Sequence, residues 1–122
     1  MNEPSHRDWT DETVKAGLHS HSVEYPTIKY IENNGFVDIY RYHHPDPVTH
    51  PGFTWICKEN NKLNERIDYI LLKGVDYDII ECDIINKGPS DHNICYATIS
   101  FNKKDWQLKY LKYKQKYIFL KQ

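Results

Sequence analysis

The sequence predicts an α+β fold in a single domain. Helical patterns lie before residue 53, whereas strand patterns cluster between residues 53 and 101. This segregation is typical of α+β proteins rather than of alternating βαβ units. A chain of 122 residues is limited to one domain, and its 39% hydrophobic and 14% aromatic content is enough for a packed core.

The first half of the chain contains one clear helix, at residues 24–34. Pro26 suits the first turn, Ile28 and Ile31 repeat at helical spacing, and Gly35 follows as a stop signal. Residues 1–21 are predicted to be irregular, and residues 35–42 to form a further amphipathic helical turn. Residues 43–52 are predicted to form a proline-rich loop.

Four segments of the second half predict strands. Each is rich in β-branched or aromatic residues and is bounded by turn or loop residues. The predicted strands are residues 53–57, 66–73, 76–85 and 94–101. A polar loop at residues 58–64 and a turn at residues 86–90 complete this part of the chain.

Residues 102–122 differ from residues 1–101 and are treated as a separate basic extension. They carry seven Lys against a single acid, Asp105, so the extension is +6 and the preceding residues are −7 within a total of −1. Apolar residues recur there at helical spacing, namely Trp106, Tyr110, Tyr113, Tyr117 and Leu120. An amphipathic helix with Asp105 as N-cap is predicted. Two roles are open for this helix: either its aromatic face packs on the domain, or its Lys face binds acidic lipid or nucleic acid.

Cysteine usage and hydropathy suggest the compartment. Three Cys without CxxC spacing do not form a disulfide framework, which favours a reducing, cytoplasmic location. No apolar run is long enough to cross a membrane, and residues 1–20 are too polar for a signal peptide. The near-neutral net charge excludes a protein that binds nucleic acid by overall charge alone.

Asp68 is the first candidate for chemistry. It lies in a run of Ile, Leu and Tyr that predicts a buried strand, where a carboxylate is costly unless it is paired. On spacing alone, a structural role remains open, in which Asp68 accepts a hydrogen bond from Arg66 or from a backbone amide.

Asp91 and His92 form the second candidate. They follow a Gly-Pro-Ser turn and open a predicted strand, so both side chains are expected near a strand end. Asp with His is a common pairing for acid–base or metal chemistry. Taken alone, the pair is better explained by a turn-capping Asp beside an unrelated His.

A zinc site is a weaker alternative. It would use the histidines of two loops, His19, His21, His43, His44 and His50. No Cys or carboxylate stands at ligand spacing to complete such a site.

The order of several strings resembles a known family. Asn-Glu-Pro-Ser from residue 2, His-Pro-Asp-Pro from 44, Thr54-Trp55, Arg-Ile-Asp-Tyr ending at 69 and Ser-Asp-His ending at 92 occur in succession. This succession resembles the C-terminal half of the endonuclease/exonuclease/phosphatase superfamily, the exonuclease III-like metal-dependent phosphoesterases, over roughly residues 1–101. The resemblance implies half of a four-layer α/β/β/α sandwich, and a general phosphodiesterase more than a DNA-repair enzyme.

The resemblance also implies roles for individual residues. His92 would contact the scissile phosphate, and Asp68 would orient and charge His92. Asp91 would lie beside Mg²⁺ or Mn²⁺, which prefer oxygen ligands. Asn2 would help to hold the attacking water or the phosphate. Trp55 would lie near the cleft, either in substrate contact or as core.

The sequence departs from the family at its start. The Gly and the water-activating Asp that precede the family's Asn have no counterpart before Asn2, nor does the metal-binding Glu further upstream. We therefore expect weak or absent metal binding, no activity from this chain alone, and self-association or pairing with an N-terminal half. The substrate is expected to be a phosphate ester of unspecified type. The alternative is a non-catalytic fragment that needs a partner chain.

Overall fold

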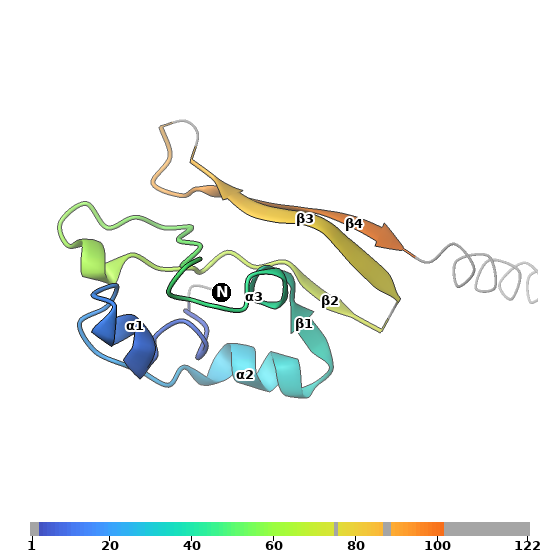
Figure 1. Cartoon of the computed structure of the whole chain (residues 1–122), viewed down its shortest axis with the longest axis horizontal. Helices are drawn as coiled ribbons and strands as arrows, with labels where there is room; N and C mark the ends of the chain where they lie inside the picture. The colour runs from blue at the N-terminus through green and yellow to red at the C-terminus, as the bar shows by residue number, and fades with distance from the viewer. Residues whose placement is uncertain (1–2, 75, 87–88, 102–122) are drawn as a thin grey trace, which may run out of the picture.

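The computed structural model describes residues 3–74, 76–86 and 89–101. Within these ranges, short helices accompany two small antiparallel sheets (Figure 1). The helices are α1 (Asp11–Lys15), α2 (Pro26–Asn33), α3 (Ile39–His43) and the 3-10 helix η1 (Asn61–Leu63). The strands are β1 (Phe36–Asp38), β2 (Leu71–Lys73), β3 (Tyr77–Ile85) and β4 (Ile94–Phe101). The predicted mixture of helices and strands is confirmed, and the described strand pairs are antiparallel.

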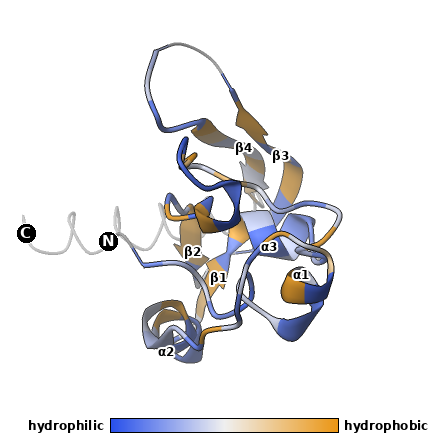
Figure 2. Ribbon diagram, turned by 90° about the vertical axis from the view of Figure 1, so that its left-hand side faces the viewer, coloured by the Kyte–Doolittle hydropathy of each residue, from blue (hydrophilic) through white to orange (hydrophobic). Residues whose placement is uncertain are grey.

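The two sheets each contain two described strands. β1 pairs with β2, and Val37 lies opposite Leu72. β3 pairs with β4 in a long hairpin whose register shifts between Ile79 and Glu81. Figure 1 shows this hairpin above β2 and α3, whereas α1 and α2 lie on the other side of the molecule. The hydrophobic segments of the strands stand out in Figure 2.

The hydrophobic core lies between α3 and the sheets. Its fully enclosed members are Ile39 and Tyr40 of α3 and Cys82 of β3. Partly buried side chains pack against them from all four strands and their flanks, namely Val37, Ile70, Leu72, Tyr77, Ile79, Ile84 and Ala97. The short helix α3 therefore joins the two sheets through apolar contact.

A buried cluster of charges forms a second core. Arg66 donates to Asp8 at 2.8 Å and to both oxygens of Asp38 at 2.8 and 2.6 Å, while Arg41 lies 2.8 Å from Asp8. All four side chains are almost completely enclosed. Burial disfavours the charge on Arg66, yet Asp8 and Asp38 more than offset this and raise its pKa. Buried charges are tolerated when they are paired and hydrogen-bonded in this way.

The N-terminal region contains a helix that the sequence analysis did not predict. α1 begins after Thr10, whose hydroxyl accepts from the amide of Thr13 while the Thr13 hydroxyl accepts from the amide of Thr10. This reciprocal capping satisfies two amides at the helix start. α2 is capped from a distance, because Glu3 accepts from the amide and the hydroxyl of Thr27.

Two predicted strands are shorter than expected. Only Leu71–Lys73 of residues 66–73 is strand, and residues 53–57 form isolated bridges at Trp55 instead of a strand. Residues 35–42 contain a strand, β1, before the expected helical turn of α3. The hairpin strands β3 and β4 lie within one residue of the predicted bounds. The predicted C-terminal helix lies outside the described residues, and no helix among those described is long and apolar enough to span a bilayer.

Candidate functional site

The segment that carries Asp68 is fixed by its neighbours. Arg66, two residues earlier, is anchored in the buried charge cluster. The amides of Ile67 and Asp68 both donate to the hydroxyl oxygen of Thr54, at 2.9 and 3.1 Å. The backbone of Asp68 is therefore held by buried groups, whereas its carboxylate points outward and its side chain is 45% exposed.

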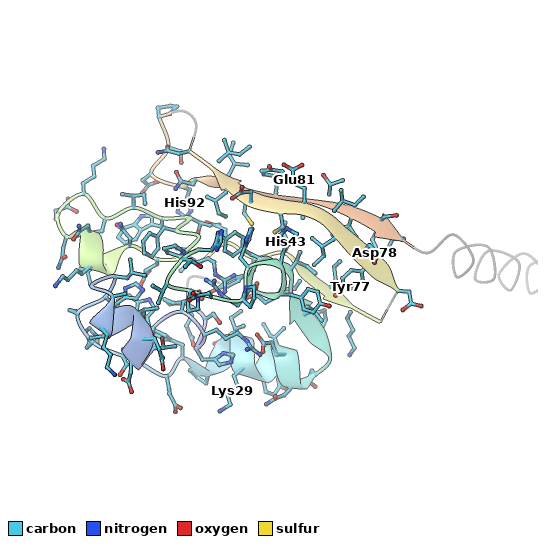
Figure 3. The ribbon with its side chains drawn as sticks, viewed as in Figure 1. Lys29, His43, Tyr77, Asp78, Glu81 and His92 are labelled. Atoms are coloured by element: carbon cyan, nitrogen blue, oxygen red, sulfur yellow. The ribbon has the colours of Figure 1, made fainter. Side chains whose placement is uncertain are left out.

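His92 is positioned by the turn before β4. Its amide donates to the hydroxyl of Ser90 at 3.1 Å, and its backbone forms an antiparallel bridge with Trp55. The same Trp55 bridges to Glu65, so residues 54–56 lie between the segment of Asp68 and the segment of His92. Figure 3 shows His92 beside the start of β4, at the end of the hairpin away from Tyr77.

Asp68 and His92 meet side chain to side chain. Nδ1 of His92 lies 2.8 Å from Oδ2 of Asp68. This hydrogen bond raises the pKa of the His92 imidazole, and the nearby charges of Asp68 and Asp91 act in the same direction. The carboxylate is an acceptor, so Nδ1 carries the proton and Nε2 is directed away from Asp68. Arg66, the sequence alternative as partner of Asp68, binds Asp8 and Asp38 instead.

Asp91 is held by Trp55. The indole Nε1–H donates to Oδ2 of Asp91 at 3.2 Å. The amide of Ile56 donates to the backbone carbonyl of Asp91 at 3.3 Å, which adds a second link between these segments. The structure thus places Trp55 next to two residues of the predicted site, Asp91 and His92, and it gives the indole a protein partner there.

The Asn-Glu-Pro-Ser string is tied to the same region by Tyr69. The Tyr69 hydroxyl lies 2.7 Å from the carbonyl of Glu3 and 2.8 Å from that of Arg66. Burial raises the pKa of this hydroxyl, so it remains a donor. Asn2, the remaining predicted catalytic residue, lies outside the described residues.

The resemblance implies Mg²⁺ or Mn²⁺ beside Asp91, and the surrounding side chains can be compared with that expectation. In the ranges that the structure describes, no three His, Cys, Asp or Glu side chains gather in a way that could hold a metal ion. One oxygen of Asp91 accepts from Trp55, and one oxygen of Asp68 accepts from His92. These residues do not fit a resident metal ion by themselves.

The loop histidines have other contacts. His19 stacks on Trp9 with ring centroids 3.9 Å apart and contacts the Lys62 carbonyl through Nδ1 at 3.0 Å. His44 stacks on His50 at 4.4 Å and contacts the Cys82 carbonyl through Nε2 at 2.7 Å. These rings pack as aromatic side chains, and one ring nitrogen of each contacts a backbone carbonyl.

Sequence reasoning did not identify two features that position the site. The sequence indicates Thr54 only as part of a Thr-Trp string, although its hydroxyl accepts from the amide of Asp68. The charge cluster around Arg66 joins residues that are 28 and 58 positions apart. A buried Arg in an apolar run was a signal for such a cluster, but its partners could not be chosen from spacing.

Comparison with known proteins finds one similar sequence. No family model and no solved structure matches the chain. The chain is similar to a Caenorhabditis elegans protein named "Uncharacterized protein F14F9.5", with 34% identity over 124 aligned residues. The alignment covers 83% of this chain but 39% of the nematode protein, so the chain spans well under half the length of that relative.

Proposed function

We propose that this chain serves phosphate-ester hydrolysis, with water attacking phosphorus in line with the leaving group. The observation that carries the proposal is the 2.8 Å contact between His92 Nδ1 and Asp68 Oδ2. The proposal also rests on the resemblance of the surrounding strings to the endonuclease/exonuclease/phosphatase superfamily. In it, His92 is the residue that touches the phosphate, Asp68 is its partner, and Asn2 and Asp91 complete the chain's contribution.

The proposed role of His92 depends on the positive charge of its protonated imidazole. An imidazole whose Nδ1–H is held by a carboxylate is more easily protonated, and the imidazolium then presents Nε2–H to an incoming anion. Negative charge builds up on the phosphoryl oxygens as water attacks, so a fixed cationic donor stabilises the transition state more than the substrate. The raised pKa of His92 keeps a larger protonated fraction near neutral pH.

The proposal includes a finer architecture. We propose that the described helices and sheets are half of a four-layer sandwich. The placement of α1 and α2 on the side opposite the β3–β4 hairpin supports this arrangement (Figure 1). The other half would come from a second chain or from further sequence.

The proposed substrate is a phosphate ester, and the proposed compartment is a reducing one. The exposed His92 and Asp68 suit an ester phosphate that approaches from solvent, and nucleic acid, lipid head group and small phosphodiester share that chemistry. Cys57, Cys82 and Cys95 are free thiols, which favours a reducing compartment such as the cytoplasm.

Hydrolysis of bis-p-nitrophenyl phosphate with Mg²⁺ or Mn²⁺ tests the proposal. The chain alone is expected to be inactive, so any turnover it shows would overturn that expectation. Turnover that is lost in His92→Ala and Asp68→Ala but kept in His21→Ala, which removes an exposed loop histidine, would support the proposed roles of the pair. Measurable turnover that is equal in the unmodified chain and in His92→Ala would contradict the proposal. A change in the metal dependence of the rate between the unmodified chain and Asp91→Asn measures how far Asp91 contributes to ion binding.

A second candidate is a non-catalytic half-domain that binds a partner chain. It is favoured by exposed apolar side chains on the hairpin, where Ile80 is 64% and Ile94 50% exposed. Burial of such side chains commonly drives association. Sedimentation velocity separates the two candidates when combined with the assay. A stable dimer without phosphodiesterase activity favours the binding role, and an active monomer excludes it.

A further inference from the structure

Thr54 is a fully buried threonine whose hydroxyl oxygen accepts two backbone hydrogen bonds. Its exposed fraction is 0%, and Oγ1 accepts from the amides of Ile67 and Asp68. A hydroxyl has two acceptor lone pairs, so both bonds can form together. Residues 66–70 precede β2 and are not part of a strand. The Thr54 hydroxyl accepts the two hydrogen bonds that a neighbouring strand would otherwise accept from these amides.

The backbone of Thr54 faces the other half of the pair. Its carbonyl accepts from the amide of Asn93 at 2.7 Å, next to His92. The side-chain amide of Asn93 donates to the carbonyl of Phe53 at 2.9 Å. One buried residue therefore contacts the backbone of Asp68 on one side and the backbone adjoining His92 on the other.

The Asp68–His92 ion pair is too weak to hold its two side chains in place by itself. The two side chains are 45% and 41% exposed, and exposed ion pairs contribute little free energy because solvent and salt screen them. Two solvated side chains on independently moving backbones would separate easily. The distance between them must therefore be set by the buried backbone that carries them.

We propose that Thr54 is a positioning residue, which sets Asp68 opposite His92 through its hydroxyl oxygen and its carbonyl. Loss of the hydroxyl releases the amide of Asp68 and lets the carboxylate move away from Nδ1. Misplacement of a catalytic group by about 1 Å can reduce a rate by about 100-fold. The effect on turnover rests on the proposed function, whereas the effect on the His92 ring does not.

The test is ¹⁵N NMR of the imidazole rings at alkaline pH, where both tautomers of a neutral ring can be told apart. Thr54→Val keeps the β-branched shape and removes the acceptor, and Thr54→Ser keeps the acceptor. We expect His92 to be an Nδ1–H tautomer in the unmodified chain and in Thr54→Ser, and a mixture in Thr54→Val. His19 is the internal control, because the Lys62 carbonyl holds its Nδ1–H independently of Thr54. An unchanged His92 tautomer in folded Thr54→Val would overturn the proposal.

Thr54→Val leaves two buried amides without an acceptor and can fail to fold. In that case Thr54→Ser and hydrogen exchange in the unmodified chain decide. Retention of the His92 tautomer in Thr54→Ser, with slow exchange of the Asp68 amide, supports the proposal. Loss of the tautomer in folded Thr54→Ser, or exchange of the Asp68 amide at the rate of an unprotected loop, overturns it.

Turnover separates this inference from the proposed function. If the chain hydrolyses phosphodiesters, we expect Thr54→Val to lower kcat by about 100-fold with little change in KM, and Thr54→Ser to restore it. If no phosphodiester is hydrolysed, the proposed function fails while the NMR result still decides the role of Thr54.

Discussion

Trp55 donates its indole N–H to Oδ2 of Asp91 across 3.2 Å. The backbone of the same residue forms bridges to Glu65 on one side and to His92 on the other. Trp55 therefore links the two segments that carry the proposed site. A role of its ring in substrate contact stays a prediction.

Replacement of Trp55 by phenylalanine keeps a ring and removes the donor. Because the hydrogen bond lies at the surface, we expect the free energy of unfolding to fall by about 1 kcal/mol, measured by urea denaturation. Asp91→Asn is the matched variant, since its amide oxygen still accepts from Nε1. A loss of about 3 kcal/mol or more in Trp55→Phe would show that the indole acts mainly as core.

The charge cluster around Arg66 gives a larger expected effect. Arg66→Lys cannot reproduce the paired bonds to Asp38 together with the bond to Asp8, and it leaves these buried carboxylates with fewer donors. We expect a loss of about 3–5 kcal/mol in the free energy of unfolding. Arg7→Lys is the control, because the Arg7–Glu32 pair is half exposed at Arg7 and should contribute below about 1 kcal/mol. Equal losses in the two variants would contradict the structural importance of burial here.

The titration of His92 provides a prediction with a definite sign. The hydrogen bond to Asp68 raises the pKa of His92 above 6.5, whereas burial lowers that of His19. In one NMR titration the two rings should therefore titrate on opposite sides of 6.5. Asp68→Asn should bring the pKa of His92 back toward the ordinary value and leave that of His19 in place.

The same shift links His92 to stability. A group with a raised pKa in the folded state binds its proton more tightly when folded, so its contribution is fully present below the unfolded pKa. That contribution is lost as pH rises through the folded pKa of His92. The unmodified chain should lose this part of its stability between about 6.5 and the higher folded value, and Asp68→Asn should lose less there.

Two glycines with positive φ allow a matched comparison. Gly52 has φ of 68°, and a β-carbon there would collide with the ring of Tyr40. Gly17 has φ of 79° with no atom within 4 Å of the added carbon. Gly17→Ala should lose about 1 kcal/mol from backbone strain, and Gly52→Ala should lose clearly more because the core residue Tyr40 must move. Thermal denaturation of both variants measures the difference, and equal melting temperatures would contradict it.

The hairpin was predictable because each of its strands is rich in β-branched or aromatic residues and is bounded by turn or loop residues. β4 begins at Ile94 and ends at Phe101, as the pattern indicated. The predicted strand at residues 66–73 was too long, because an apolar run has the same composition whether its amides pair with a strand or with Thr54. α1 was missed because five residues carry too little periodicity, and its cap uses Thr13 where Glu or Gln is the usual signal.

The site was predictable only in part. The resemblance selected Asp68 and His92 as partners, and their atoms lie within hydrogen-bonding distance. It did not indicate Thr54, because a hydroxyl that accepts from distant amides leaves no local pattern. Asp91 is the predicted residue beside a metal ion, and it lies in the described part of the chain. Asn2, predicted to hold the attacking water or the phosphate, lies outside that part.

The buried charge cluster has a consequence for the rate of folding. Asp8 and Arg66 are 58 positions apart, and Asp38 and Arg66 are 28 apart. Their contacts close long loops, and the entropy of each closure is lost before any charge pairing rewards it. We expect these contacts to form after the rate-limiting barrier, so that weakening them accelerates unfolding much more than it slows refolding. The cluster would then govern how long a folded molecule persists.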